Sequence, residues 1–150
     1  MAQSLSKIIV HLVFSTKNRK EWITEDFQPK LHAYLATVAR NQGWECYRVG
    51  GVGDHVHMAL LQPRTANLSD FTGHVKRTSS LWIKQQDEQY AEFHWQKGYG
   101  AFSVSASQLD DLVTYISRQK EHHQKCSFQD EFRNLLLKYG VDYDERYVWD

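Results

Sequence analysis

The sequence predicts an α+β fold in which helices pack against an antiparallel sheet. Residues 7–16 are rich in β-branched and aromatic side chains, and residues 24–41 carry apolar side chains at the three- and four-residue spacing of a helix. Segments of these two kinds recur along the chain in the order β-α-β-β-α-β. This order is typical of the split β-α-β, or ferredoxin-like, arrangement, in which helices cover one face of a central antiparallel sheet.

The first half of this pattern runs from the opening strand to a hairpin. The apolar positions that define the first helix are Leu31, Tyr34, Leu35 and Val38. Gly43 follows where that helix would stop. Residues 45–49 and 55–62 are expected to be the second and third strands, and the glycine-rich segment 50–54 would join them as a hairpin.

The second half begins with a long helix and a short pair of strands. Asn67 or Ser69 can cap a helix that runs to about residue 89. Its buried side would carry Phe71, Val75, Leu81 and Trp82. Residues 93–95 and 101–104 are expected to form short strands on either side of a glycine-containing turn.

Two further helices are expected, over residues 107–123 and about 128–139. In a ferredoxin-like sheet the first and third strands are neighbours at the centre. We expect the face away from the crossover helices to be open to a ligand or a second subunit. No linker or internal repeat interrupts the pattern, and 150 residues suit one ordinary domain, so a single domain is expected over residues 1–150.

Composition and charge limit the classes of function. The chain is 41% hydrophobic and 24% charged, as globular proteins are, and its 18 Lys and Arg residues balance its 18 Asp and Glu residues. Any nucleic acid would therefore have to bind to local basic patches. The apolar run at residues 8–14 is too short to cross a bilayer and lacks a cleavage-site pattern, so we expect a cytoplasmic protein without a membrane partner.

The most informative segment is Gly53-Asp54-His55-Val56-His57, which sets two histidines two residues apart in the third strand. Side chains at positions i and i+2 of a strand project from the same face, so both imidazoles would point the same way. Two converging imidazoles can hold a divalent metal and leave room for a substrate oxygen. The competing explanation is a pair of ordinary core histidines, because a lone H-x-H pattern is common.

A second constellation lies in the third helix, Tyr115-Ile116-Ser117-Arg118-Gln119. Tyr115 and Gln119 are four residues apart and share a helix face, which alone would usually indicate packing. Together with the histidines they suggest chemistry. A metal held by His55 and His57 could polarise a phosphodiester, Gln119 could add a neutral oxygen ligand, and Tyr115 could attack the activated phosphate.

These motifs resemble the HUH single-tyrosine transposases, the small single-strand transposases of bacterial insertion sequences. Four stretches carry the resemblance, in order and over roughly residues 5–125: an opening strand with a basic exit at residues 11–19, the histidine pair at 54–57, a helix at 68–82, and the tyrosine helix at 115–119. Each stretch is weak alone, but the ordered set is specific.

The resemblance implies a role for each matching residue. His55, His57 and Gln119 would be ligands of Mg²⁺ or Mn²⁺, and Tyr115 would form a 5′-phosphotyrosine with single-stranded DNA that carries hairpins near the ends of a mobile element. Family members are dimers in which the tyrosine helix of one subunit can complete the site of the other. Two imidazoles suit manganese, zinc or nickel better than magnesium.

Other polar residues are weaker candidates. His122 and His123 follow Gln119 by a full turn and are left outside the metal site, because histidines at helix ends more often interact with the last carbonyls. His11, on the neighbouring strand, could reach the site, although packing is the expected role. For contacts to the DNA backbone, which compete with ordinary solvated charge, the candidates are Lys17, Arg19, Lys76, Arg77 and Arg118.

Two alternatives remain open at this stage. The chain could be a non-catalytic, domesticated protein that binds single-stranded nucleic acid on the same fold. An RNA-binding sheet would want exposed aromatic residues on its central strands, whereas this sheet offers histidines. The chain could also be a metal-dependent hydrolase that uses His55 and His57 with water and does not need Tyr115.

Overall fold

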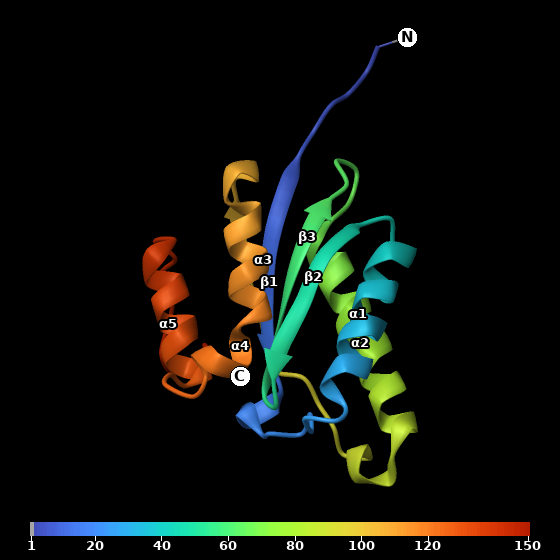
Figure 1. The fold of residues 1–150 in the computed structure, drawn as a ribbon, viewed down its shortest axis with the longest axis vertical. Helices are drawn as coiled ribbons and strands as arrows, with labels where there is room; N and C mark the ends of the chain where they lie inside the picture. The colour runs from blue at the N-terminus through green and yellow to red at the C-terminus, as the bar shows by residue number, and fades with distance from the viewer. Residues whose placement is uncertain (1) are drawn as a thin grey trace.

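Four strands form one antiparallel sheet in the order β2-β3-β1-β4 (Figure 1). The computed structural model describes residues 2–150. Its strands are β1 (Ile8–Ser15), β2 (Glu45–Val52), β3 (His55–Gln62) and β4 (Gly100–Val104). All three neighbouring pairs are antiparallel. This is the predicted ferredoxin-like order, and it places the H-x-H strand beside β1 at the centre of the sheet.

The α-helices within residues 2–150 are α1 (Gln28–Asn41), α2 (Leu68–Gln86), α3 (Leu109–Ser117), α4 (Gln119–His122) and α5 (Phe128–Lys138). Asn67 caps α2, as one of the two predicted capping residues, by accepting a hydrogen bond from the Asp70 backbone N–H. The single helix predicted over residues 107–123 is divided in two at Arg118, whose backbone (φ −103°, ψ 20°) is not helical.

Two strand predictions need correction. β2 continues through Gly50 and Gly51 to Val52, so the hairpin turn is only Gly53-Asp54. Residues 93–95 form no strand, only one isolated bridge between Thr16 and Trp95. A short 3₁₀ segment (Lys17–Arg19) begins directly after Thr16, so residues 93–95 have no extended strand there with which to form a longer ladder.

One face of the sheet is covered by α1 and α2, as predicted (Figure 1). Alternate side chains of β1 and β3 supply this core, because successive residues of a strand point to opposite faces. They are Leu12, Phe14, Val56, Met58 and Leu60, and they pack in one cluster with Leu31, Leu35, Val75 and Ile83 of the two helices. Leu81, which the sequence pattern placed on the buried side of α2, is instead 65% exposed.

The opposite face is not open, contrary to the prediction. The chain's own α3, α4 and α5 lie across it, on the other side of the sheet from α1 and α2 (Figure 1). Leu112 and Ile116 of α3 pack on β1 and β3, and the apolar side of α5 packs beside them on β1 and β4. The α5 contacts are made by Phe128, Phe132 and Leu136 against Val13 and Phe102. Any ligand that reaches this face must therefore enter between the sheet and these helices.

Gly50 lets α3 approach the sheet closely. A Cβ atom at Gly50 would lie 2.4 Å from the backbone oxygen of Ile116, a separation that two such atoms cannot adopt. We expect Gly50→Ala to push α3 away and to lower the free energy of unfolding by about 1–3 kcal/mol, the usual cost of overpacking. Urea unfolding of both variants would measure this, with Gly98→Ala as the matched control because no heavy atom lies within 4 Å of its Cβ position. Equal stability of the two variants would contradict the close packing.

No helix in the described part of the chain is long and apolar enough to cross a membrane.

Candidate metal and nucleophile site

β3 directs both histidines of the H-x-H pattern to the face covered by α3, α4 and α5. The side chains of His55 and His57 are completely buried, and their ring centroids are 5.0 Å apart. Val56, between them, points into the core under α1 and α2. The predicted alternation is confirmed.

The Nδ1 atom of each imidazole ring contacts a neighbouring polar group. The Nδ1 atom of His55 is 2.7 Å from Oδ1 of Asp54, and Nδ1 of His57 is 2.7 Å from Nε2 of His11. These contacts fix the ring orientations and leave both Nε2 atoms facing the same point. Partners of this kind orient the histidine ligands of metal sites.

The side chains of Tyr115 on α3 and Gln119 on α4 approach the two histidines from the helices that cover this face of the sheet. The Oε1 atom of Gln119 is 2.9 Å from Nε2 of His55, and the Tyr115 ring centroid is 5.7 Å from that of His57. The break at Arg118 separates α3 from α4, yet the two side chains still share one face. The structure therefore brings together the four residues that the sequence singled out, although they lie about 60 positions apart.

A buried carboxylate from α5 completes the cluster. Oε1 of Glu131 lies 3.0 Å from Nε2 of His57 and 3.3 Å from Nε2 of His55. Its other oxygen, Oε2, accepts hydrogen bonds from the Gln119 amide, at 3.0 Å, and from the Tyr115 hydroxyl. Glu131 is only 3% exposed. One carboxylate thus contacts the histidine pair with one oxygen and the tyrosine with the other.

A family model described as "Transposase IS200 like" matches residues 4–119 of the chain. The chain belongs to this family. The match includes the H-x-H strand, Tyr115 and Gln119, and it ends before α5. No curated protein sequence matches this IS200-like chain.

Two solved structures resemble the fold of this family member. A candidate transposase from Deinococcus radiodurans R1 is 21% identical with a TM-score of 0.60, over 79% of this chain and 98% of that one. A REP-associated tyrosine transposase bound to a REP hairpin is 15% identical with a TM-score of 0.59, over 82% of this chain and 74% of that one. At these identities the likeness shows the shared α+β fold.

Four residues around this site were missed or set aside in the sequence, and one of them is His122, whose Nε2 atom lies 3.4 Å from Oε2 of Glu131. His123, left outside the metal site, has its Nε2 atom 3.0 Å from Oε1 of Glu131. His11 contacts His57 directly. Glu131 was not considered, although an acidic residue at position 131 interrupts the apolar side that Phe128 and Phe132 define in the last helix. That interruption was the available signal.

The titrations of the cluster are strongly coupled. Burial opposes the charged form of His55, but hydrogen bonds with Asp54 and Glu131 outweigh it and raise the pKa of His55 to about 9. Burial lowers the pKa of His57 to about 4. Burial also opposes ionisation of Glu131, but its contacts with His123, His55 and His57 hold the pKa well below the usual range. The cluster therefore contains a buried carboxylate, beside which the protonated form of His55 and the neutral form of His57 are favoured.

Tyr115 is a protonated hydrogen-bond donor in this environment. Its burial and the neighbouring negative charge of Glu131 both raise the pKa of its hydroxyl well above the ordinary value. A phenol of this kind is a weak nucleophile unless its target is made strongly electrophilic.

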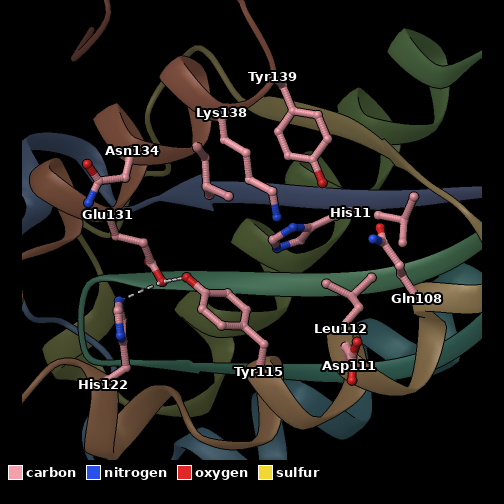
Figure 2. Close-up of a pocket in the computed structure, with 12 residues that line it drawn as sticks. His11, Gln108, Asp111, Leu112, Tyr115, His122, Glu131, Asn134, Lys138 and Tyr139 are labelled. Carbon is pink, nitrogen blue, oxygen red and sulfur yellow. Dashed lines mark hydrogen bonds and ion pairs between the residues drawn. The ribbon is translucent and has the colours of Figure 1, made fainter.

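A pocket gives access to this hydroxyl. It has a volume of about 410 Å³ and opens beside Tyr115, between α3 and α5 (Figure 2). Figure 2 shows Glu131 between Tyr115 and His122, with Lys138 and Tyr139 on the far wall. Asp111 of α3, Asn134 of α5 and Gln108, which directly precedes α3, also line the pocket. The Tyr115 side chain is therefore accessible from this pocket.

The five basic residues proposed for DNA contacts differ in their surroundings. The Lys76 ammonium donates to the backbone carbonyls of Gln96, Lys97 and Gly98, at 2.5, 3.1 and 2.9 Å. Arg19 donates to the Trp149 carbonyl at 2.6 Å. Both cations already have protein partners. The exposed members of the set are Lys17, Arg77 and Arg118.

Proposed function

We propose that this chain is a metal-dependent transposase that cleaves and rejoins single-stranded DNA through a 5′-phosphotyrosine at Tyr115. The observation that carries the proposal is the position of the Tyr115 hydroxyl, which opens to a pocket and lies in the same buried cluster as the H-x-H pair and Gln119. A tyrosine with a packing role alone would not require a set of possible metal ligands beside its hydroxyl.

The donor set fits a divalent ion held by His55, His57 and Gln119. The contact of Nδ1 of His55 with a carboxylate places one ring proton there, so Nε2 is the nitrogen that can give a lone pair to an ion once its own proton has left. The Gln119 oxygen lies 2.9 Å from this nitrogen, and ligands about 2.1 Å from one ion and at right angles are about 3 Å apart. A bound Mg²⁺ or Mn²⁺ would withdraw charge from the phosphate oxygens and make the phosphorus more electrophilic. Nitrogen donors favour Mn²⁺ of the two.

The residues of the chain then supply the nucleophile and its alignment. The Tyr115 oxygen would form a bond to the phosphorus while the bond from phosphorus to the 3′ oxygen breaks. The 3′ oxygen would take up a proton from solvent, so that the upstream strand leaves with a 3′ hydroxyl. The phenolic proton leaves Tyr115 toward the groups around it, of which the Glu131 carboxylate is the hydrogen-bond acceptor. Attack of a 3′ hydroxyl on the phosphotyrosine reverses the step and joins a new strand.

The proposed substrate is single-stranded DNA with hairpins near the ends of a mobile element. A REP-associated transposase of similar fold was solved with a REP hairpin, which supports DNA hairpins as ligands of this chain. Lys17, Arg77 and Arg118 are the exposed candidates for contacts with the backbone phosphates.

The test is formation of a covalent adduct. Single strands from the DNA that flanks the gene would carry a label at the 3′ end, because the downstream fragment retains the tyrosine linkage. Incubation with Mn²⁺ and denaturing electrophoresis should give a labelled band at the mass of protein plus DNA fragment. Binding without this band would support the non-catalytic alternative, and cleavage without it would support a hydrolase that uses water.

We also propose a homodimer in which Tyr115 acts on the DNA bound in its own subunit. The support is that Tyr115 contacts Glu131, and through it the histidine pair, within a single chain. A mixture of Tyr115→Phe and His57→Ala subunits should then remain inactive, because no subunit has both groups. Each variant would be tested alone and mixed, in the adduct assay. Recovery to about a quarter or more of wild-type activity in the mixture would show that the tyrosine acts in trans.

A further inference from the structure

Glu131 lies outside the part of the chain that defines the family. The family match ends at residue 119, and Glu131 follows on α5, twelve positions after Gln119. Its position is nevertheless fixed by packing. Phe128 lies with its ring centroid 4.5 Å from that of His55, and Phe132 occupies the space left by the missing side chain of Gly100. The sheet therefore holds α5, and with it the carboxylate, in the site.

Three imidazoles converge on one oxygen of this carboxylate. Nε2 of His57 and Nε2 of His123 are each 3.0 Å from Oε1 of Glu131, and Nε2 of His55 is 3.3 Å away. The ligand atoms of all four residues lie within 4.8 Å of one another. Ligands about 2.1 Å from one ion and at right angles to each other are about 3 Å apart, so the three distances from Oε1 are those expected of ligands of one ion.

The proton positions indicate that something positive belongs between these atoms. Nδ1 of His123 is 2.6 Å from the Cys126 carbonyl oxygen, which can only accept, so this nitrogen carries the ring proton. His55 has its proton on Nδ1 for the same reason, next to Asp54. A ring that carries only this proton, as a metal ligand must, presents the lone pair of Nε2 to the carboxylate oxygen. Lone pairs at this distance repel unless a proton or a metal ion lies between them.

We propose that Glu131 and His123 are also ligands of the divalent ion, Glu131 through Oε1, so that three histidines, one carboxylate and the Gln119 amide form the site, which α5 helps to assemble. This inference rests on the proposed function, which names only His55, His57 and Gln119. Glu131 supplies the only negative charge among these five donors. Its Oε2 atom meanwhile holds the Tyr115 hydroxyl, so one side chain connects the ion to the nucleophile.

Direct titration of the full chain with Mn²⁺ tests the inference without an activity assay. Free Mn²⁺ would be followed by electron paramagnetic resonance for the wild type, Glu131→Gln, His57→Ala and the control Glu121→Gln. Glu121 is exposed on α4, so this control removes the same charge and leaves the cluster intact. We expect one ion per wild-type chain, at least about tenfold weaker binding in Glu131→Gln, and binding within twofold of wild type in Glu121→Gln.

The outcomes separate this inference from the proposed function. If His57→Ala loses binding while Glu131→Gln stays within twofold of wild type, Glu131 is not a ligand and the function stands. If His57→Ala binds as well as wild type, or wild type takes up no ion, the proposed metal site itself is wrong. Circular dichroism in EDTA would confirm folding of each variant. If Glu131→Gln does not fold, His123→Asn is measured instead, and an unchanged affinity and unchanged nitrogen modulation in its pulsed spectrum would overturn the inference.

Discussion

Tyr115→Phe is expected to abolish covalent attachment to DNA, reducing adduct formation by at least about a thousandfold, while the affinity for hairpin DNA stays within about threefold of wild type. The substitution removes one hydroxyl and keeps the aromatic ring, whose contacts with His11 and His57 are made by its faces and edges. Glu131 loses one hydrogen-bond donor but keeps its contacts with the imidazoles. The site should therefore keep its shape and lose only the nucleophile.

Two measurements would check this expectation. Denaturing electrophoresis of 3′-labelled strands reports the adduct, and a native gel shift reports binding. The matched control is Tyr139→Phe, because Tyr139, which directly follows α5, lines the same pocket and would lose a hydroxyl of the same kind without a role in the reaction. An adduct formed by Tyr115→Phe at a rate near that of wild type would show that another residue attacks the phosphate. Loss of the adduct in both variants would indicate a general effect of the pocket lining.

The sequence predicted the H-x-H geometry because that geometry depends on local periodicity. A strand places His55 and His57 on one face whatever surrounds it, and the apolar run over residues 55–61 identified the strand in the sequence. The relation of Tyr115 to Gln119 was predictable for the same reason, since four residues span about one helical turn. The break at Arg118 did not disturb it.

The face of the sheet opposite α1 and α2 is covered through contacts between residues far apart in the chain, which no local sequence pattern predicts. The pattern of the last helix showed an apolar side but not the surface that this side covers. Glu131 meets His57 from 74 positions away in the chain. His123 was set aside because helix-end histidines usually interact with carbonyls. It does contact the Cys126 carbonyl through Nδ1, and that contact directs its other nitrogen into the site.

The basic residues show a different limit of sequence reasoning. Lys76 lies in the predicted second helix beside Arg77 and looks like a solvent-facing cation in the sequence. In the fold, the segment after Trp95 crosses its position and presents three backbone carbonyls to the ammonium group. A loop without regular structure gave no sign of this path. Charge alone therefore could not separate Lys76 from exposed residues such as Arg118.

His57→Ala is expected to reduce Mn²⁺-dependent cleavage by at least about a hundredfold and to leave hairpin binding largely intact. His57 is fully buried, and its Nε2 atom contacts Glu131 while its Nδ1 atom contacts His11. Removing the ring takes away one proposed metal donor together with its contact to His11. DNA binding is proposed to depend on phosphate contacts of exposed basic residues, which the substitution does not touch.

The dependence on metal concentration makes this expectation specific. A variant that has lost one ligand should need a higher Mn²⁺ concentration for half-maximal cleavage, so its titration curve should shift to the right as well as fall. EDTA should stop the wild-type reaction, and excess Mn²⁺ should restore it. The control is His94→Ala, an exposed histidine whose loss should leave the curve unchanged. If His57→Ala cleaves at the wild-type rate at every Mn²⁺ concentration, or if wild type cleaves in EDTA, the histidine pair does not act through a metal. Tyr115 would then need another source of activation, and the arrangement of Asp54, His55 and Glu131 would have to be explained by hydrogen bonding alone.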